Sequence, residues 1–479
     1  MDFPLIRQLK HLGQHPHAPF YAPGHKLGRG MGAPWREWLG EEVGRADFPE
    51  LPEVGNLFGT TGAIAKTQHL AAQTFGAQET FFLVNGSTGG ILAAILATCG
   101  EGERLLLPRN VHQSALHGLI LSGAMPVFIQ PEYDPGRDVA YGVTPEAVEG
   151  ALGEYSDIKA VLVVYPTYQG IGGDLEAIAN ITHHYGVPLL VDEAHGAHFA
   201  FHPDLPPSAL SLGADLTVQS THKVLGALSQ ASMVHVQGPR LDRARLNHAL
   251  RLVQSTSPNS LLLASLESAT YQMATEGEAL LTETLALAAQ AEAAIATLPS
   301  LNRVDWPTVP RPGYQWRDRT RLTVFLQHLA LTGFEADEIL QQLGVIPELP
   351  LEKSLTFILT FGNTPQDIEA LISGLEYLSA TFPPQDPSPP LILPSPLPPP
   401  RLTPREAFFR PKIALPIAQT IGRICGESIC CYPPGIPLLM PGEEITATAL
   451  AALEQVLHLG GEIIGLQDAN FETLLVVNC

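Results

Sequence analysis

Short apolar runs recur between residues 79 and 218, and longer stretches with helical periodicity separate them. The runs are rich in Val, Ile, Leu and Phe and are apolar on both faces, which is typical of strands covered by helices on both sides. We expect strands at residues 80–84, 104–107, 125–129, 160–164, 187–191 and 216–218, and helices at 89–98, 111–122 and 175–185. This alternation predicts an α/β fold with a mostly parallel sheet.

The pattern changes further along the chain and indicates where domains meet. Beyond about residue 240, Ala- and Leu-rich stretches such as 280–298 predict packing helices that lead into a smaller α/β domain. Proline removes backbone donors and stiffens the chain, so the proline-rich stretch 383–404 should be an extended linker. The predicted order is an N-terminal segment (1–78), a large domain (79–300), a small domain (301–382), the linker and a C-terminal domain (405–479).

Composition and charge narrow the class of protein. The 479 residues are 45% hydrophobic and 16% charged, as in a compact globular protein. The formal net charge of −21 argues against nucleic acid or an anionic membrane as a partner, and it is compatible with a cationic substrate. Five cysteines without a CxxC pair argue against a disulfide framework. The N-terminus has no secretion signal and no apolar run is long enough to span a bilayer, so we expect a cytoplasmic protein without a membrane anchor.

The most specific chemistry is carried by Asp192 and Lys223. Asp192 closes the predicted strand 187–191, and Lys223 follows the predicted strand 216–218. A lysine can hold the aldehyde of pyridoxal phosphate as a Schiff base, and a carboxylate can keep the pyridine nitrogen of that cofactor protonated, so that the ring accepts electrons. The pair predicts a pyridoxal phosphate site at the carboxyl edge of the sheet.

Groups for the cofactor's phosphate and ring lie in two earlier turns. Ser87, Thr88 and Gly89 stand in a glycine-rich turn between a strand and a helix, where hydroxyls and free backbone N–H groups can cradle a phosphate. An ordinary tight turn has the same composition. His112 begins the next helix and could stack on the pyridine ring, whereas the simpler interpretation is a capping or exposed histidine.

The segments beside Asp192 and Lys223 add further candidates. Ala194 and His195 follow Asp192, and His195 is placed to reach the ring or its phenolic oxygen. Ser220 and His222 precede Lys223 and could hold phosphate oxygens. The alternatives are an N-cap for Asp192 and core packing for the histidines. We predict no metal site, because the Asp/Glu/His cluster lacks a second ligand pair at a recognisable spacing.

These motifs, in this order, resemble the Orn/Lys/Arg decarboxylase family, the bacterial pyridoxal phosphate-dependent decarboxylases with the aspartate aminotransferase (type I) fold. The resemblance covers nearly the whole chain. The length of the chain is similar to that of the short bacterial arginine and lysine decarboxylases, which lack an N-terminal wing domain. Ser-Thr-His-Lys at 220–223 and Tyr-Pro-Pro-Gly-Ile-Pro at 432–437 are its most specific segments. The other matching segments are 22–26, 85–88, 109–112, 192–195, 255–258 and 441–443.

The resemblance implies α-decarboxylation of a basic amino acid and gives each candidate a role. Lys223 would bind the cofactor covalently, Asp192 would pair with its nitrogen and His112 would stack on its ring. The phosphate would be held by Ser87, Thr88, Ser220 and His222. The acid that reprotonates Cα is left open among His222, Lys223 and a group of the C-terminal domain. Residues 255–257 match a loop that often reaches a neighbouring subunit's cofactor, so we expect a homodimer or larger homo-oligomer. Larger family members carry a different residue where His195 stands.

The resemblance also favours arginine or lysine as substrate over ornithine. A distal cation buried beside a cofactor needs a carboxylate partner. Acids before the first strand and in the C-terminal domain are the candidates, and we predict that the partner is among Asp47, Glu50, Glu53, Glu443 and Glu444. The C-terminal domain should therefore be needed for activity.

Two alternatives remain open from the sequence. One is another type I enzyme, either an aminotransferase or an α-oxoamine synthase, and the latter resembles this chain in Asp-Glu-Ala-His at 192–195. The other is a pyridoxal phosphate-binding protein without turnover. An aminotransferase usually grips the substrate α-carboxylate with an arginine on a late small-domain strand. The run 355–360 contains no arginine, which favours a decarboxylase.

Overall fold

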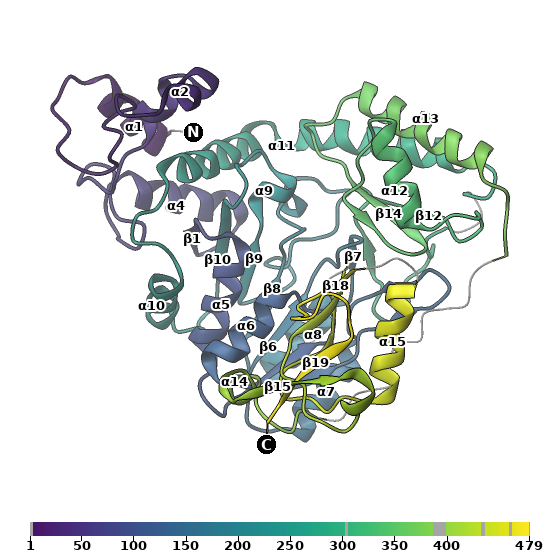
Figure 1. The fold of residues 1–479 in the computed structure, drawn as a ribbon. Coiled ribbons are helices and arrows are strands. Elements are labelled where there is room, and N and C mark those ends of the chain that lie inside the picture. Colours follow the sequence, from purple (N-terminus) through teal and green to yellow (C-terminus); the bar gives the residue numbers. More distant parts are fainter. Residues whose placement is uncertain (1–2, 302–304, 387–398, 433–435, 459–461, 479) are drawn as a thin grey trace.

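The computed structural model describes residues 3–301, 305–386, 399–432, 436–458 and 462–478. Within these ranges seven strands form the central sheet, in the order β1-β10-β9-β8-β6-β2-β3 (Figure 1). The strands from β9 to β3 pair in parallel, whereas β10 is antiparallel to both β1 and β9. Their bounds are β1 Glu79–Leu83, β2 Arg104–Pro108, β3 Met125–Ile129, β6 Ile158–Val164, β8 Leu189–Asp192, β9 Leu216–Gln219 and β10 Ser232–Val236.

Alternate residues of the strands enter two apolar cores, one on each face of the sheet. Leu105 and Leu107 of β2 lie in one core, and Leu106 lies in the other. The first core also holds residues of α5, α6 and α10, and the second holds residues of α7 and α8. The bounds of these helices are α5 Gly86–Thr98, α6 Gln113–Ser122, α7 Pro145–Glu154, α8 Leu175–His184 and α10 Arg243–Val253.

Gly90 sets how closely α5 approaches the sheet. A Cβ at this position would lie 2.6 Å from Cγ1 of Val218 on β9. A larger residue would therefore push α5 away from the sheet. The turn that begins α5 would move with it, away from the strand ends where the candidate site lies.

The predicted α/β fold with a mostly parallel sheet is confirmed, and each of the six predicted strands overlaps an observed one. Strand β10 was not predicted, because Ser232 and His235 interrupt its apolar pattern. Both ring nitrogens of the buried His235 are satisfied inside the sheet: Nδ1 lies 2.8 Å from Oγ1 of Thr80 and Nε2 lies 3.0 Å from Oε1 of Gln219. The hydrogen bonds make burial of this polar side chain tolerable.

A long helix, α11 (Ser260–Ile295), joins the large sheet to a smaller α/β unit (Figure 1). Its side chains enter three apolar cores in turn, with Leu263 in the first, Leu281 in the second and Ala288 in the third. The third core is closed by an antiparallel sheet in the order β12-β14-β13 and by two helices. Their bounds are β12 Arg321–Phe325, β13 Leu349–Pro350, β14 Ser354–Ile358, α12 Gly333–Gln342 and α13 Pro365–Thr381.

The C-terminal unit has its own core and lies against the large sheet domain (Figure 1). Helix α14 packs on α6, where Nη2 of Arg405 donates to the carbonyl of Leu121 at 2.8 Å. Most of the predicted linker, residues 387–398, lies outside the described ranges, as do 433–435 of the Tyr-Pro-Pro-Gly motif. The elements are α14 Pro404–Phe409, β15 Lys412–Pro416, β16 Ile429–Tyr432, β17 Ile436–Leu439, α15 Ala447–His458, β18 Glu462–Ile464 and β19 Thr473–Val477.

The N-terminal segment packs on α11 through one buried acid. Glu267 accepts hydrogen bonds from the backbone N–H of Leu5 and Ile6, at 2.8 and 2.7 Å, and from Oγ1 of Thr67 at 2.6 Å. It thereby satisfies free donors at the start of α1. The helices here are α1 Pro4–Gln14, α2 Ala33–Leu39, α3 Glu42–Ala46 and α4 Gly62–Phe75.

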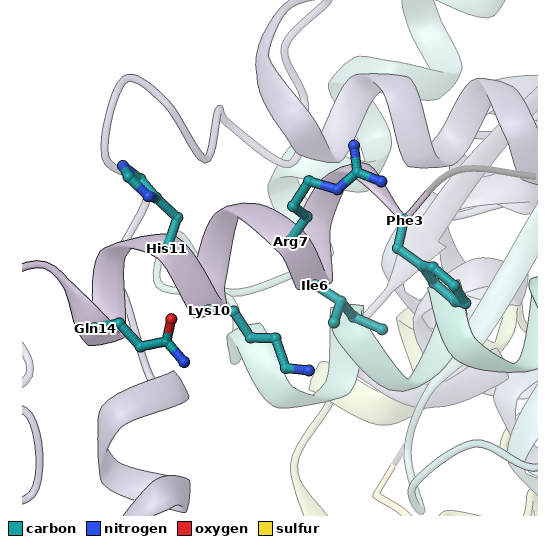
Figure 2. Close-up of a pocket in the computed structure, with 6 residues that line it drawn as sticks. All are labelled: Phe3, Ile6, Arg7, Lys10, His11 and Gln14. Atoms are coloured by element: carbon teal, nitrogen blue, oxygen red, sulfur yellow. The ribbon is translucent and has the colours of Figure 1, made fainter.

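A surface hollow lies along one side of α1 and is lined by Phe3, Ile6, Arg7, Lys10, His11 and Gln14 (Figure 2). It shares no residue with the predicted site. None of the helices within the described part of the chain is long and apolar enough to cross a membrane.

Candidate active site

The candidate site lies where neighbouring strands of the central sheet end. Asp192 is the last residue of β8 and pairs in parallel register with Val218 of β9. Lys223 follows β9 on the short helix α9 (Thr221–Val224). Because parallel strands end at the same edge, the sheet brings the acid and the lysine to one place, as predicted.

Lys223 is part of a hydrogen-bonded chain that crosses to the small domain. Its Nζ lies 2.9 Å from Nε2 of His195, and Nδ1 of the same ring lies 2.9 Å from Nη2 of Arg321. Arg321 begins β12 and is fully buried. Burial lowers the pKa of Lys223 and holds the pKa of His195 well below its usual value.

Asp192 is a buried carboxylate with few partners. Within the described residues its side chain accepts one hydrogen bond, from the backbone N–H of Ala194 at 3.2 Å. Burial raises the pKa of Asp192, and the charges of His112 and Lys223 act in the opposite direction. A carboxylate in this setting is stabilised by a cation placed beside it, and a protonated pyridine nitrogen is such a cation.

Hydroxyl groups meet at the start of α5. Oγ of Ser220 lies 2.8 Å from Oγ of Ser87, which stands in the first turn of that helix next to Thr88 and Gly89. The buried Oγ1 of Thr221 has no hydrogen-bond partner among the described residues. A helix N-terminus with adjacent hydroxyls suits an anion, so the groups gathered here fit a phosphate.

His112 and His222 have hydrogen bonds that bear on their predicted roles. His112 is the N-cap of α6, and its Nδ1 accepts from the backbone N–H of Ser114 at 3.2 Å, so the capping alternative describes it correctly. Burial lowers its pKa; the Asp192 charge opposes this effect and the Lys223 charge adds to it. His222 Nδ1 lies 2.9 Å from the carbonyl of Ala231 and donates to it. The stacking and phosphate roles of these two histidines stay predictions.

Three residues near Lys223 were missed by the sequence analysis: Arg321, Tyr168 and Glu348. The Tyr168 ring lies 4.5 Å from that of His195, and Nζ of Lys223 lies 5.9 Å from the Tyr168 centroid. The Tyr168 hydroxyl donates to Oε1 of Glu348. The available signals were an arginine opening an apolar run at 321–326 and a tyrosine in the turn after the strand 158–164.

An arginine on a late small-domain strand does reach the site. Strand β14 has none, but the neighbouring strand β12 sends Arg321 into the site. The two strands pair side by side, with Arg321 opposite Ile358. The absence of an arginine from 355–360 therefore says nothing against an aminotransferase.

Four of the five acids proposed for the substrate's cation have other partners within the chain. Asp47 Oδ2 lies 3.2 Å from Nε2 of His25, and Glu50 accepts from the backbone N–H of Leu57 at 2.6 Å. Glu444 pairs with Arg401 and Glu443 with Arg109. The fifth, Glu53, is exposed on the N-terminal segment. No described contact joins any of the five to Lys223.

The Arg109–Glu443 pair is an interdomain contact, and Arg109 lies three residues before His112. Nη2 of Arg109 lies 2.7 Å from Oε2 of Glu443 and 2.9 Å from the carbonyl of Leu438, and Nη1 contacts the other carboxylate oxygen. The two side chains are only 10% and 2% exposed. A buried bidentate pair of this kind fixes the orientation of the C-terminal unit against the end of β2.

We expect Glu443→Gln to weaken the attachment of the C-terminal unit. The change leaves the Arg109 charge buried without its counterion, which costs about 3–5 kcal/mol. Thermal unfolding and limited proteolysis after the linker would report it. Glu444→Gln is the matched control, because its pair with Arg401 is more exposed to solvent, at 27% and 63%, and a pair near the surface is worth about 0–1 kcal/mol. Equal effects of the two variants would show that the buried pair does not hold the unit.

Comparison with solved structures and curated proteins agrees with the fold. The lysine decarboxylase of Francisella novicida matches with a TM-score of 0.86 at 22% identity, over 99% of this chain and 81% of that one. At this identity the match shows the fold alone. Arginine decarboxylases of Bacillus anthracis and Bacillus subtilis are 36% and 35% identical, over 99% of this chain and 97% and 98% of theirs.

Two domains of one protein family match most of the chain. The major domain of Orn/Lys/Arg decarboxylases matches residues 3–310, and the C-terminal domain of the same family matches residues 394–462. The chain belongs to the Orn/Lys/Arg decarboxylase family. The predicted family, type I fold and decarboxylase class are confirmed.

Proposed function

We propose that this protein decarboxylates a basic L-amino acid with pyridoxal phosphate, and that arginine is its preferred substrate. The observation that carries the proposal is the meeting of the Lys223 amine and the buried Asp192 carboxylate at one edge of the sheet. The near full-length similarity to arginine decarboxylases supports arginine over lysine and ornithine.

The cofactor would be held by the residues gathered around that edge. Ser87, Thr88, Gly89 and Ser220 would bind its phosphate, with His222 as a further predicted ligand. Asp192 would pair with the ring nitrogen, and His112 and Ala194 would lie against the ring. When bound, the cofactor supplies an electron sink for the electron pair left on Cα as CO₂ departs.

The chain's own residues would prepare and protect this chemistry. Lys223, with a pKa lowered by burial, would offer an uncharged amine that exchanges with the substrate amine. His195 and Tyr168 lie beside it and would limit its movement. His222 and Lys223 remain the candidates for returning a proton to Cα.

Glu348 is the acid best placed for the substrate's distal cation. It is exposed, it accepts from the Tyr168 hydroxyl, and its charge acts on both Lys223 and Arg321. The Tyr168 ring lies between Lys223 and this carboxylate and presents an aromatic face to a cation. A substrate attached near Lys223 could extend along the ring and end at Glu348.

A substrate panel with two variants tests both parts of the proposal. We expect the purified protein to release CO₂ from arginine, and more slowly from lysine and ornithine. Loss of a charge-assisted hydrogen bond should lower kcat/KM of Glu348→Gln for arginine by about 10- to 100-fold. Turnover of a neutral analogue should not change. Glu338→Gln, another exposed acid of the small domain, is the control. Decarboxylation of only neutral or acidic amino acids would contradict the substrate, and an unaffected Glu348→Gln would contradict the pocket.

We also propose that the working unit is a homodimer or larger homo-oligomer. Residues 255–257 are exposed. The adjoining Gln254 accepts a hydrogen bond from the backbone N–H of Val84 at 2.8 Å, and Val84 directly precedes the turn that carries Ser87. Trp38 is 76% exposed and Phe20 is 94% exposed, which is typical of surfaces that bind another chain. Light scattering at assay concentrations should give at least twice the chain mass. A fully active monomer would contradict this.

A further inference from the structure

The contacts of His195 define where its proton lies. Nη2 of Arg321 is 2.9 Å from Nδ1 of the ring, and Nζ of Lys223 is 2.9 Å from Nε2. A guanidinium has donors and no acceptor, so Nδ1 must accept. In a neutral imidazole whose Nδ1 accepts, the proton is on Nε2, and this N–H points at the lysine.

The N–H of His195 in turn determines the protonation state of Lys223. An ammonium group has three donors and no lone pair, so it cannot accept from Nε2 of His195. Only the uncharged amine can. The uncharged amine is also the form that can attack a carbonyl carbon.

The surroundings of Arg321 hold it in place for this contact. A Cβ on Gly170 would lie 2.7 Å from both Cβ and Cγ of Arg321, so the glycine backbone is packed against the arginine stem. Gly170 has φ +82°, a conformation that favours glycine. The acid Asp318 balances the buried guanidinium charge from the same loop. Its carboxylate in turn pairs with His198, with Oδ2 3.0 Å from Nε2.

We propose that Arg321 is a positioning residue: by donating to Nδ1 it fixes the proton of His195 on Nε2 and so keeps Lys223 an uncharged hydrogen-bond acceptor. The inference rests on the proposed function, in which Lys223 is the reacting amine. Charged and titratable groups that act on this amine come from several elements. Besides His195 itself, they are Asp192 on β8, His112 before α6, Tyr168 after β6, His222 on α9, Arg321 on β12 and Glu348 before β13.

The electrostatics agree with this arrangement. Burial is the main cause of the lowered pKa of Lys223, and the Arg321 charge lowers it further, against Asp192 and Glu348. His195 lies among Lys223, Arg321 and two other histidines, which all oppose its protonation. A neutral ring between a guanidinium and an uncharged amine is consistent with each direction.

A rival explanation is that Arg321 grips the substrate α-carboxylate. Its Nε and Nη1 have no hydrogen-bond partner among the described residues, so donors are available. The rival makes a different prediction. Loss of Arg321 would then raise KM for the amino acid while leaving inhibition by the amine product, which has no carboxylate, unchanged. It would also leave the reactivity of Lys223 unchanged in the protein without substrate.

The test measures the reactivity of Lys223 against pH in the full-length protein freed of cofactor. An amine-selective acylating reagent is applied across a pH series, and modification of the Lys223 peptide is read by mass spectrometry. We expect Arg321→Leu to raise the midpoint by about one pH unit, a tenfold loss of uncharged amine at fixed pH. Arg319→Leu is the control, because Arg319 lies just before β12 and pairs with Glu292 of α11 at 2.6 Å, away from Lys223.

A double-mutant cycle separates the hydrogen bond from the charge of Arg321. In a His195→Phe background, Arg321→Leu should shift the midpoint much less than in the His195 protein. Equal shifts in both backgrounds, or no shift in either, would overturn the proposal. Arg321→Gln keeps a hydrogen-bond donor without the charge, so its midpoint for Lys223 modification should lie between those of the wild type and Arg321→Leu. It also serves as the second variant if the Arg321→Leu protein fails to fold. The readout needs no turnover, so absence of decarboxylation would count against the proposed function and leave this result standing.

Discussion

Lys223→Ala should abolish covalent attachment of the cofactor and reduce turnover by on the order of 10³-fold or more, because the nucleophilic amine and a proton carrier are lost together. Borohydride reduction of the cofactor-loaded wild type, followed by peptide mapping, should label Lys223. The variant should be unlabelled and should melt near the wild-type temperature, since Lys223 contacts His195 by a hydrogen bond and forms no ion pair within the described part of the chain.

Lys159→Ala is the matched control for this experiment. Lys159 is a half-exposed lysine of β6 that lies 3.9 Å from Glu103, outside the candidate site. Its loss should leave both labelling and turnover unchanged. Labelling of a different lysine in the wild type would show that the reacting amine has been assigned to the wrong residue.

The parts of the site that could be predicted from sequence are those that the sheet itself brings together. Asp192 and Lys223 each follow an apolar run, and parallel strands end at a common edge, so their proximity follows from the pattern. The same holds for the turn at Ser87, whose hydroxyl meets that of Ser220. Local pattern and strand direction were sufficient for these residues.

The residues that were missed depend on contacts between domains. Arg321 lies 126 positions from His195 in the chain, and Glu348 lies 180 positions from Tyr168. Nothing in the local sequence fixes how the small domain turns its strands toward the large sheet. Arg321 lies on β12, whereas the prediction concerned only the neighbouring strand, at 355–360.

Glu443 is another residue whose partner depends on a contact between domains. It was proposed as a substrate ligand because acids near a basic substrate are plausible partners, but Arg109, 334 positions earlier, pairs with it. The sequence shows that an acid is present but not which cation it contacts. Because Glu443 is buried and already paired with a guanidinium, its carboxylate is poorly suited to bind the cation of a ligand.

Asp192→Asn should keep the fold and the bound cofactor but reduce turnover by about 10²- to 10³-fold, the cost of removing one preorganised electrostatic group. A neutral amide cannot hold a ring nitrogen protonated, so the ring would accept electrons poorly. Stability should not fall, because the change removes a carboxylate whose ionisation is disfavoured by burial.

The measurement pairs turnover with the absorbance of the bound cofactor, so that loss of binding and loss of reactivity are distinguished. Asp174→Asn is the control: Asp174 caps α8, where its side chain accepts from Ala177 N–H at 3.1 Å, and asparagine caps a helix equally well. Near-normal turnover by cofactor-loaded Asp192→Asn would mean that the acid at the end of β8 does not act on the ring. A colourless variant would mean that Asp192 is needed first to bind the cofactor. The expected result, a coloured and folded protein with little turnover, assigns the carboxylate to the chemical step.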